Sequence, residues 1–305
     1  FVMKTILSNP PRVLAAQGLC KNYAEQTVLK DLDLALEPGR IYGLIGRNGA
    51  GKTTLLSLLT GQNLPTAGAI TYGGAPVWEN AAALSEFYFA RELASGSDLG
   101  SLAVKRFLRA ASLFCPYWDE PYAQSLLQKF NVPTNKTINK LSRGQASMLA
   151  ITVALASRAP VTLLDEPTAG LDVVMREKFY HILLEDYAAT GRTFVISTHI
   201  IEEAAGVFER VVILDEGKVV ADEPTDALLD RFRSVSGPAE AVRAALAARG
   251  LTPMQNQQVG KYVMTTVRGT DSDWAALADD PALDLEGMNL QNVFVALCGH
   301  GDEEG

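Results

Sequence analysis

The chain has 305 residues, 48% of them hydrophobic, which is enough to bury the core of one large domain and a second, smaller one. Its 27 basic and 35 acidic residues give a net charge of −8, which argues against a broad nucleic-acid-binding surface. A small anion could still be held by a local site.

Strands and helices alternate over the first two thirds of the chain. The helical pattern between them is longest from about 80 to 157, where large apolar residues gather at 107–118. This alternation predicts an α/β fold with a mixed sheet and a helical subdomain at 80–157, within a domain of residues 1–236. Strands are expected at 12–23, 27–39, 40–46, 67–74, 161–167 and 193–198, helices at 171–190 and 200–208, and a hairpin at 210–222.

The character of the sequence changes near 234–240, and residues 237–305 are expected to form a small α+β accessory domain. Helices are predicted at 238–248 and 271–278, with two strands between them, the second at 261–267. In the last predicted helix, Leu290, Val293, Phe294 and Leu297 share one apolar face, which favours docking onto the body of the protein.

One apolar stretch, 146–164, could be mistaken for a membrane span. Arg158 and Pro160 interrupt it, and the unbroken part has the length of a buried core helix. The sequence therefore predicts no transmembrane segment, and any role at a membrane requires a partner protein.

The stretch "GRNGAGKTT" (46–54) follows a predicted strand and precedes an apolar helix, as in a phosphate-binding loop. Gly46, Gly49 and Gly51 let backbone N–H groups close around phosphates. Lys52 can reach the β- and γ-phosphate oxygens, and the hydroxyl of Thr53 can bind Mg²⁺.

A predicted strand that ends in two acidic residues complements this loop. In "VTLLDE" (161–166), Asp165 is placed to hold the metal through water, and Glu166 suits a general base for the attacking water. His199 ends another predicted buried strand and is a further candidate for catalysis.

A second phosphate-binding helix start lies at "LSRGQ" (141–145). Ser142 and Gly144, at the N-terminus of the helix, would present donors to an anion. One chain therefore carries two phosphate-binding motifs.

With these motifs together, residues 12–230 resemble the ATP-binding subunit of an ABC transporter. The Walker A loop is matched by Gly46–Thr54, a range that includes Asn48 and ends at Thr54. The Walker B strand is matched by Val161–Glu166. "LSRGQ", including Gln145, matches the signature sequence. Tyr23 matches the aromatic residue that stacks on adenine, Asp172 the D-loop aspartate, and His199 the switch histidine.

The resemblance implies an ATPase that uses ATP and Mg²⁺. It also implies that two such subunits, identical or homologous, pair head to tail, each signature binding the γ-phosphate held by the other chain. The partner would be a separate polytopic membrane permease, and no nucleic acid is implied. The expected location is the cytoplasmic face of the membrane, and the nearer resemblance is to bacterial exporter-type subunits. The apolar patch at 107–118 is expected to dock a cytoplasmic helix of the permease.

One position departs from the family pattern. The family normally has a glutamine between the Walker A and signature motifs that touches Mg²⁺ and the attacking water, but residues 75–123 contain no glutamine. Glu92, or Glu86, is expected to replace it as an oxygen ligand of the metal.

Two other functions compete with the transporter subunit. A soluble ABC ATPase acting on DNA or ribosomes would need a long coiled-coil insertion or two cassettes, and this chain has only residues 55–160 between its Walker motifs. A nucleotide-binding module without turnover is suggested by the missing glutamine and opposed by the pair Glu166 and His199.

Overall fold

The computed structural model describes residues 12–93 and 98–299, which divide into two compact units. The first unit runs to Phe208 and includes Val212–Asp222, and the second comprises Glu209–Val211 and the chain from Glu223 onward. The division therefore falls earlier than the expected boundary at 236. That boundary would cut through β11 (Phe232–Pro238), a central strand of the C-terminal sheet.

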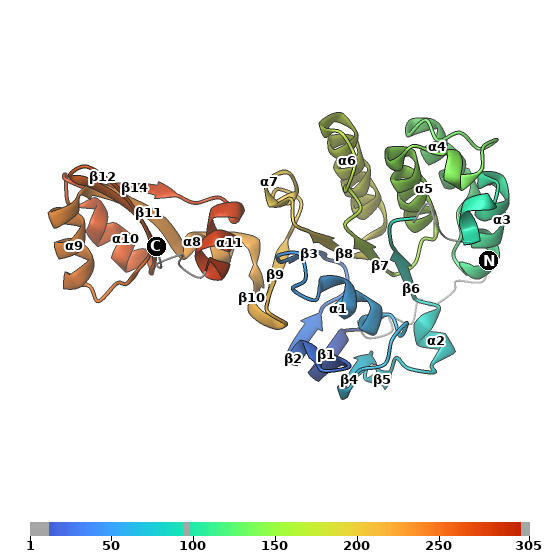
Figure 1. The fold of residues 1–305 in the computed structure, drawn as a ribbon, viewed down its shortest axis with the longest axis horizontal. Helices are drawn as coiled ribbons and strands as arrows, with labels where there is room; N and C mark the ends of the chain where they lie inside the picture. The colour runs from blue at the N-terminus through green and yellow to red at the C-terminus, as the bar shows by residue number, and fades with distance from the viewer. Residues whose placement is uncertain (1–11, 94–97, 300–305) are drawn as a thin grey trace, which may run out of the picture. The chain divides into compact units, whose positions relative to one another are not determined.

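Two sheets form the body of the first unit (Figure 1). One is an antiparallel sheet in the order β2-β1-β4-β5, and the other a six-stranded sheet in the order β10-β9-β3-β8-β7-β6, with β3, β8, β7 and β6 parallel. The bounds of the strands are β1 (Leu14–Tyr23), β2 (Gln26–Leu36), β3 (Ile41–Ile45), β4 (Ala67–Tyr72), β5 (Ala75–Pro76), β6 (Phe87–Ala90), β7 (Val161–Asp165), β8 (Thr193–Thr198), β9 (Arg210–Asp215) and β10 (Lys218–Pro224).

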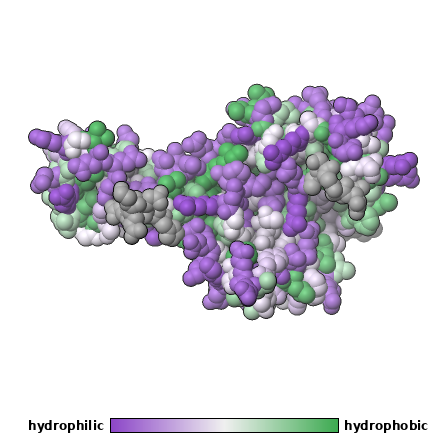
Figure 2. Space-filling model, in the orientation of Figure 1, coloured by the Kyte–Doolittle hydropathy of each residue, from purple (hydrophilic) through white to green (hydrophobic). Residues whose placement is uncertain are grey.

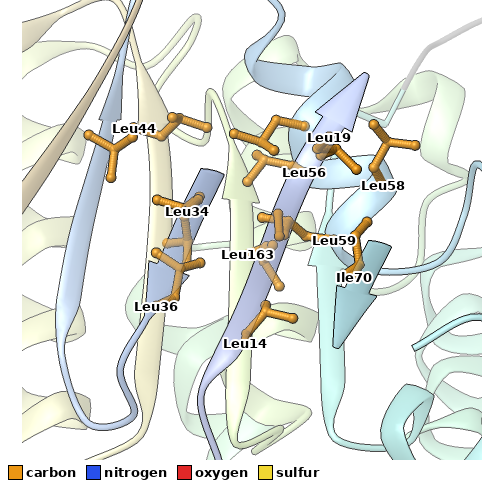
Figure 3. Packing of buried hydrophobic residues seen from close by; sticks show 14 of the residues in the cluster. Leu14, Leu19, Leu34, Leu36, Leu44, Leu56, Leu58, Leu59, Ile70 and Leu163 are labelled. Atoms are coloured by element: carbon orange, nitrogen blue, oxygen red, sulfur yellow. The ribbon is translucent and has the colours of Figure 1, made fainter. Parts of the chain in front are cut away.

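Helix α1 lies between the two sheets, and α5 and α6 lie beyond the other face of the six-stranded sheet (Figure 1). The leucines of α1 pack with those of β1, β2 and β7 in one buried cluster (Figure 3). Because Lys52 is the first residue of α1, this packing fixes the phosphate-binding loop. The helices are α1 (Lys52–Leu59), α2 (Ala81–Leu84), α3 (Val104–Phe114), α4 (Glu120–Lys129), α5 (Arg143–Ala156), α6 (Val173–Thr190) and α7 (Ile201–Ala204), with 3₁₀ turns at Asp98–Ser101 and Ile138–Lys140.

The predicted helical region 80–157 contains a strand that the sequence analysis missed. Residues of β6 pair in parallel with β7 and extend the sheet beside the predicted Walker B strand. The helix predicted at 200–208 is shorter than expected, since α7 ends at Ala204. The other predicted strands and helices of this unit are present with shifts of a few residues.

The second unit has the element order β11-α9-β12-β13-α10-β14, and its strands pair antiparallel in the order β12-β13-β11-β14. This is the ferredoxin-like arrangement of a split βαβ motif. Strands β11 and β14 and helix α8 were not predicted. The bounds are α8 (Thr225–Asp230), α9 (Ala239–Ala248), β12 (Pro253–Val259), β13 (Tyr262–Arg268), α10 (Asp271–Ala278), β14 (Asp284–Gly287) and α11 (Leu290–Cys298).

The face drawn in Figure 2 is mainly hydrophilic, with apolar residues in small separate patches. No helix within residues 12–93 and 98–299 combines the length and the apolar character needed to cross a membrane. The apolar residues of 146–164 belong to α5 and β7.

A buried ion-pair network connects α4, α5 and α6. The side chain of Asp186, on α6, is fully buried, and its Oδ2 atom accepts hydrogen bonds from Arg158 at 3.1 Å and Arg192 at 2.9 Å. Arg158 also donates to Asp119, the residue that caps the N-terminus of α4. Burial lowers the pKa of Arg192, and Asp186 beside it opposes that shift. The network thus ties the helical region to the sheet.

Replacing Asp186 by Asn should lower the free energy of unfolding by about 3–5 kcal/mol, because it leaves two guanidinium groups without their buried counter-charge. This change is measured by unfolding the full chain in denaturant and monitoring the transition by tryptophan fluorescence. Glu37→Gln is the matched control, since Glu37 pairs with Arg40 in an exposed position, and it should cost less than about 1 kcal/mol. Equal, small effects of the two substitutions would contradict the structural role of the network.

Candidate functional site

The phosphate-binding loop connects β3 to α1, and two of its glycines are required by their surroundings. A Cβ atom at Gly46 would lie 2.5 Å from the carbonyl oxygen of Leu214. Gly51 has a φ angle of 105° and would place a Cβ 2.7 Å from Leu29. Without these side chains, the loop can keep its backbone N–H groups at the N-terminus of α1, where an anion is favoured. Asn48 and Gly49 lie exposed on the loop, and Thr54 follows on α1.

Lys52 is buried under this loop. Its Nζ atom donates to the carbonyl oxygen of Gly46 at 2.7 Å and lies 3.3 Å from Oε1 of Glu166. The loop and the end of β7 are therefore joined through one ammonium group.

Asp165, at the end of β7, is held by two hydroxyl groups. Thr53 donates to its Oδ2 atom at 2.7 Å, and Ser197 donates to its Oδ1 atom at 2.6 Å. Ser197 lies opposite Asp165 in the parallel register of β7 and β8. The structure thus places Thr53 and Asp165, the predicted metal ligands, in direct contact.

Ser197 is a site residue that the sequence analysis did not identify. Besides holding Asp165, its hydroxyl oxygen accepts the backbone N–H of Glu166 at 3.0 Å. A small hydroxyl residue near the end of the strand before His199 was the available signal. Nothing in one sequence, however, gives the register that pairs this strand with β7.

Glu166 and His199, the two predicted catalytic residues, are in contact. Nδ1 of His199 lies 2.7 Å from Oε2 of Glu166, whose other oxygen faces Lys52. The backbone of Glu166 has a φ angle of 49°, a conformation that is uncommon outside glycine and is found often at functional sites. The Glu166 side chain is about one quarter exposed, so solvent can reach its carboxylate.

The signature residues form the beginning of α5. Ser142 is the N-cap, and its hydroxyl accepts from the N–H of Gln145, whose side chain accepts from the N–H of Ser142. Asp172 caps α6 in the same way, by accepting from the N–H of Met175. These bonds set the start of both helices, and none of them involves the phosphate-binding loop.

Arg143, the third residue of "LSRGQ", joins two other segments. Its Nε atom donates to Oε1 of Glu92 at 2.8 Å. It also packs over Gly170, where an added Cβ would lie 2.7 Å from the Arg143 Cδ atom. Gly144 faces the same turn, since a Cβ there would lie 3.7 Å from the Gly170 carbonyl oxygen. The signature and the turn before α6 therefore form one packed surface.

Glu92, the expected metal ligand, forms an ion pair with Arg143. Glu92 follows β6, and it lines a cavity of about 20 Å³ together with Asp165 and Glu166. Its carboxylate, however, is bonded to the guanidinium of Arg143, and more than half of the Glu92 side chain is exposed. Glu86, the other candidate, accepts a hydrogen bond from Tyr117.

We expect Glu92→Gln to leave the Mg²⁺ dependence of ATP hydrolysis unchanged, because the Glu92 carboxylate is paired with Arg143. The substitution should also perturb the site little, since losing an exposed ion pair costs at most about 1 kcal/mol. The measurement is a Mg²⁺ titration of the ATPase rate for the wild type, Glu92→Gln and the partner variant Arg143→Ala. A higher Mg²⁺ requirement in Glu92→Gln alone would restore the metal-ligand role.

Tyr23, the predicted adenine-stacking residue, ends β1. Its ring is about half exposed, and the ammonium group of Lys21 lies 4.8 Å from the ring centre. An exposed aromatic face is available for a base to stack on.

The comparisons with known proteins agree with this geometry. The family model described as ABC transporter matches residues 29–169. The ABC transporter ATP-binding protein YtrB of Bacillus subtilis is 26% identical over 94% of this chain and 98% of its own length. The aliphatic sulfonates import ATP-binding protein SsuB of Pseudomonas putida is 30% identical over 82% of this chain and 94% of its own.

Among solved structures, an ATP-binding subunit of an ABC transporter superposes with a TM-score of 0.63 and 26% identity, covering 71% of this chain and 91% of that one. The expected family and the expected ABC-type cassette fold are therefore confirmed. The expected exporter direction finds no support, since SsuB is named an import protein. The chain belongs to the ABC transporter family, as one of its ATP-binding and ATP-hydrolysing subunits.

Proposed function

We propose that Glu166 is the general base with which this subunit hydrolyses ATP to drive a separate membrane permease. The observation that carries this proposal is the contact of the Glu166 carboxylate with both Lys52 and His199. Lys52 would reach the β- and γ-phosphates of ATP, so a base beside it faces the phosphate that is attacked. His199 would orient that carboxylate and the water.

Thr53 and Asp165 fit a Mg²⁺ ion that is shared with the nucleotide. A hydroxyl and a carboxylate oxygen meet there, and the described residues hold no cluster of three or more His, Cys, Asp or Glu side chains suited to a metal. Mg²⁺ commonly takes one or two protein oxygens and completes its shell with phosphate and water. When bound, the ion neutralises charge that develops on the phosphates.

The remaining site residues would bind the nucleotide. We assign adenine stacking to Tyr23, whose ring face is exposed, and phosphate binding to the loop N–H groups of Gly46, Asn48, Gly49, Gly51 and Thr54. Ser142, Gly144 and Gln145 begin α5, and their hydrogen bonds within the chain do not reach Lys52 or Thr53. We therefore propose that they bind the γ-phosphate held by a second subunit, with Asp172 at the contact between the two chains.

The permease would dock on the end of α3. Leu113 and Phe114 are about four fifths exposed at the end of this helix, and Tyr117 beside them is partly exposed. Phe114 and Tyr117 border a groove of about 260 Å³ that also contains aromatic residues of β6. Large exposed apolar residues beside a groove are typical of an interface, and docking here would hold the subunit at the cytoplasmic face of the membrane. The SsuB relatives give no support for export, so the proposal is confined to powering the permease.

The variant Leu113→Ser/Phe114→Ser should reduce co-purification of the polytopic membrane protein by about tenfold or more, as expected when buried anchors of an interface are removed. Basal ATPase activity should stay at the wild-type level, since neither residue contacts the site. Val259→Ser, which removes an exposed apolar residue of the second unit, is the matched control. Unchanged co-purification of the double variant would overturn this docking surface.

A further inference from the structure

The C-terminal sheet buries only one of its faces under α9 and α10. Val235 and Val267 pack there against residues of both helices, such as Leu246 and Trp274. Because side chains alternate along a strand, the residues next to Val235 and Val267 on their strands point to the opposite face of the sheet.

On that opposite face, the strand register aligns one row of polar side chains across all four strands. Glu286 lies opposite Ser234, Ser234 opposite Thr266, and Thr266 opposite Gln255. The next row contains Met264 and Gln257, which lie opposite each other.

Helix α11 lies against this face and is drawn apart from α9 and α10 (Figure 1). The side chain of Gln255 donates to the carbonyl oxygen of Val295, on α11, at 3.0 Å. A cavity of about 390 Å³ lies between the helix and the sheet. It is lined by the polar row, by Gln257, Met264 and Met288, and by Asn292 and Val295 of α11. Its volume is in the range of cavities that hold small molecules.

Five of the polar side chains that line this cavity make no hydrogen bond to another described residue, whereas Gln255 and Thr265 do. Thr266 is 8% exposed, and its hydroxyl makes no hydrogen bond to another described residue. The same holds within the described chain for the side chains of Ser234, Gln257, Glu286 and Asn292. Of these five side chains only Thr266 is buried; Ser234 is half-buried, and Gln257, Glu286 and Asn292 are exposed. Their hydrogen-bonding groups are therefore open to a polar molecule that enters the cavity from solvent.

The charge of the lining selects the occupant. Glu286 is the one charged residue among the described residues that line the cavity, and none of them is basic. The thioethers of Met264 and Met288 and the side chain of Val295 supply an apolar wall suited to methylene groups. We propose that this cavity binds a small polar molecule that carries a protonated amine, with the amine at Glu286 and its other polar groups on Thr266, Ser234 and the amide side chains.

The test uses the full chain without ATP, so its outcome is independent of the proposed ATPase mechanism. The chain has six methionines, so ¹³C-methyl labelling gives few signals, and Met264→Leu and Met288→Leu assign the two in the cavity. The probe is 1,4-diaminobutane, and 1,4-butanediol is the neutral compound of the same length.

We expect the diamine to shift both methyl signals saturably, with a Kd in the millimolar range that is usual for a ligand of about six heavy atoms. The diol should give no saturable shift. Glu286→Gln should weaken diamine binding about fivefold or more, as for the loss of a charge-assisted hydrogen bond. Thr266→Val should weaken it less, and Glu240→Gln, a carboxylate change on α9, should leave it unchanged. Absence of a saturable shift, equal shifts with the diol, or unchanged binding by Glu286→Gln would overturn the proposal.

Discussion

Glu166→Gln should reduce ATP hydrolysis by about 10²–10⁴-fold, the usual loss when a general base is removed. ATP binding should survive, because the amide has nearly the same shape and Lys52 keeps its bonds to the carbonyl oxygens of Gly46 and Arg47. The variant should therefore accumulate in the ATP-bound state.

Single-turnover hydrolysis of radiolabelled ATP, with equilibrium binding measured on the same samples, separates the two effects. Glu177→Gln is a suitable control, since Glu177 is an exposed carboxylate on α6 away from the loop. A near-normal rate in Glu166→Gln would show that another group activates the water. Loss of ATP binding would instead indicate a role in positioning Lys52.

Local sequence patterns were sufficient to predict the phosphate-binding loop. Glycines at fixed spacing, a lysine and a threonine between a strand and a helix define one backbone path, and the structure has that path from Gly46 to Thr53. The contact of Thr53 with Asp165 could also be expected, because both lie at the carboxyl ends of parallel strands or directly after them.

Contacts that depend on strand register were not predictable. Ser197 meets Asp165 only because β7 and β8 align residue by residue, and a single sequence carries no signal for that alignment.

The strand β6 was hidden because its four residues lie inside a region of helical character. The pairing of Glu92 with Arg143 joins residues far apart in the chain, so local patterns could not predict it. In the second unit, β11 was not predicted because its alternation of small and apolar residues is weak.

The head-to-tail arrangement predicts that two inactive variants restore activity when mixed. Lys52→Ala removes phosphate binding by the loop, and Ser142→Arg blocks the signature, so a homodimer of either has no complete site. A mixed dimer has one complete site, formed by Lys52 of one chain and Ser142 of the other. Random mixing in equal amounts makes half of the dimers mixed, so about a quarter of the wild-type activity should return if the two sites act independently.

The head-to-tail dimer is tested most directly by the ATPase rate as a function of the molar ratio of these two variants at constant total protein. We expect rates near background for each variant alone and a maximum at equal amounts. Mixing each variant with Lys52→Ala/Ser142→Arg, in which both motifs are removed, should give no recovery. A flat profile across all ratios, with each variant shown to be folded, would contradict a composite site in which one chain's signature completes the other chain's nucleotide site.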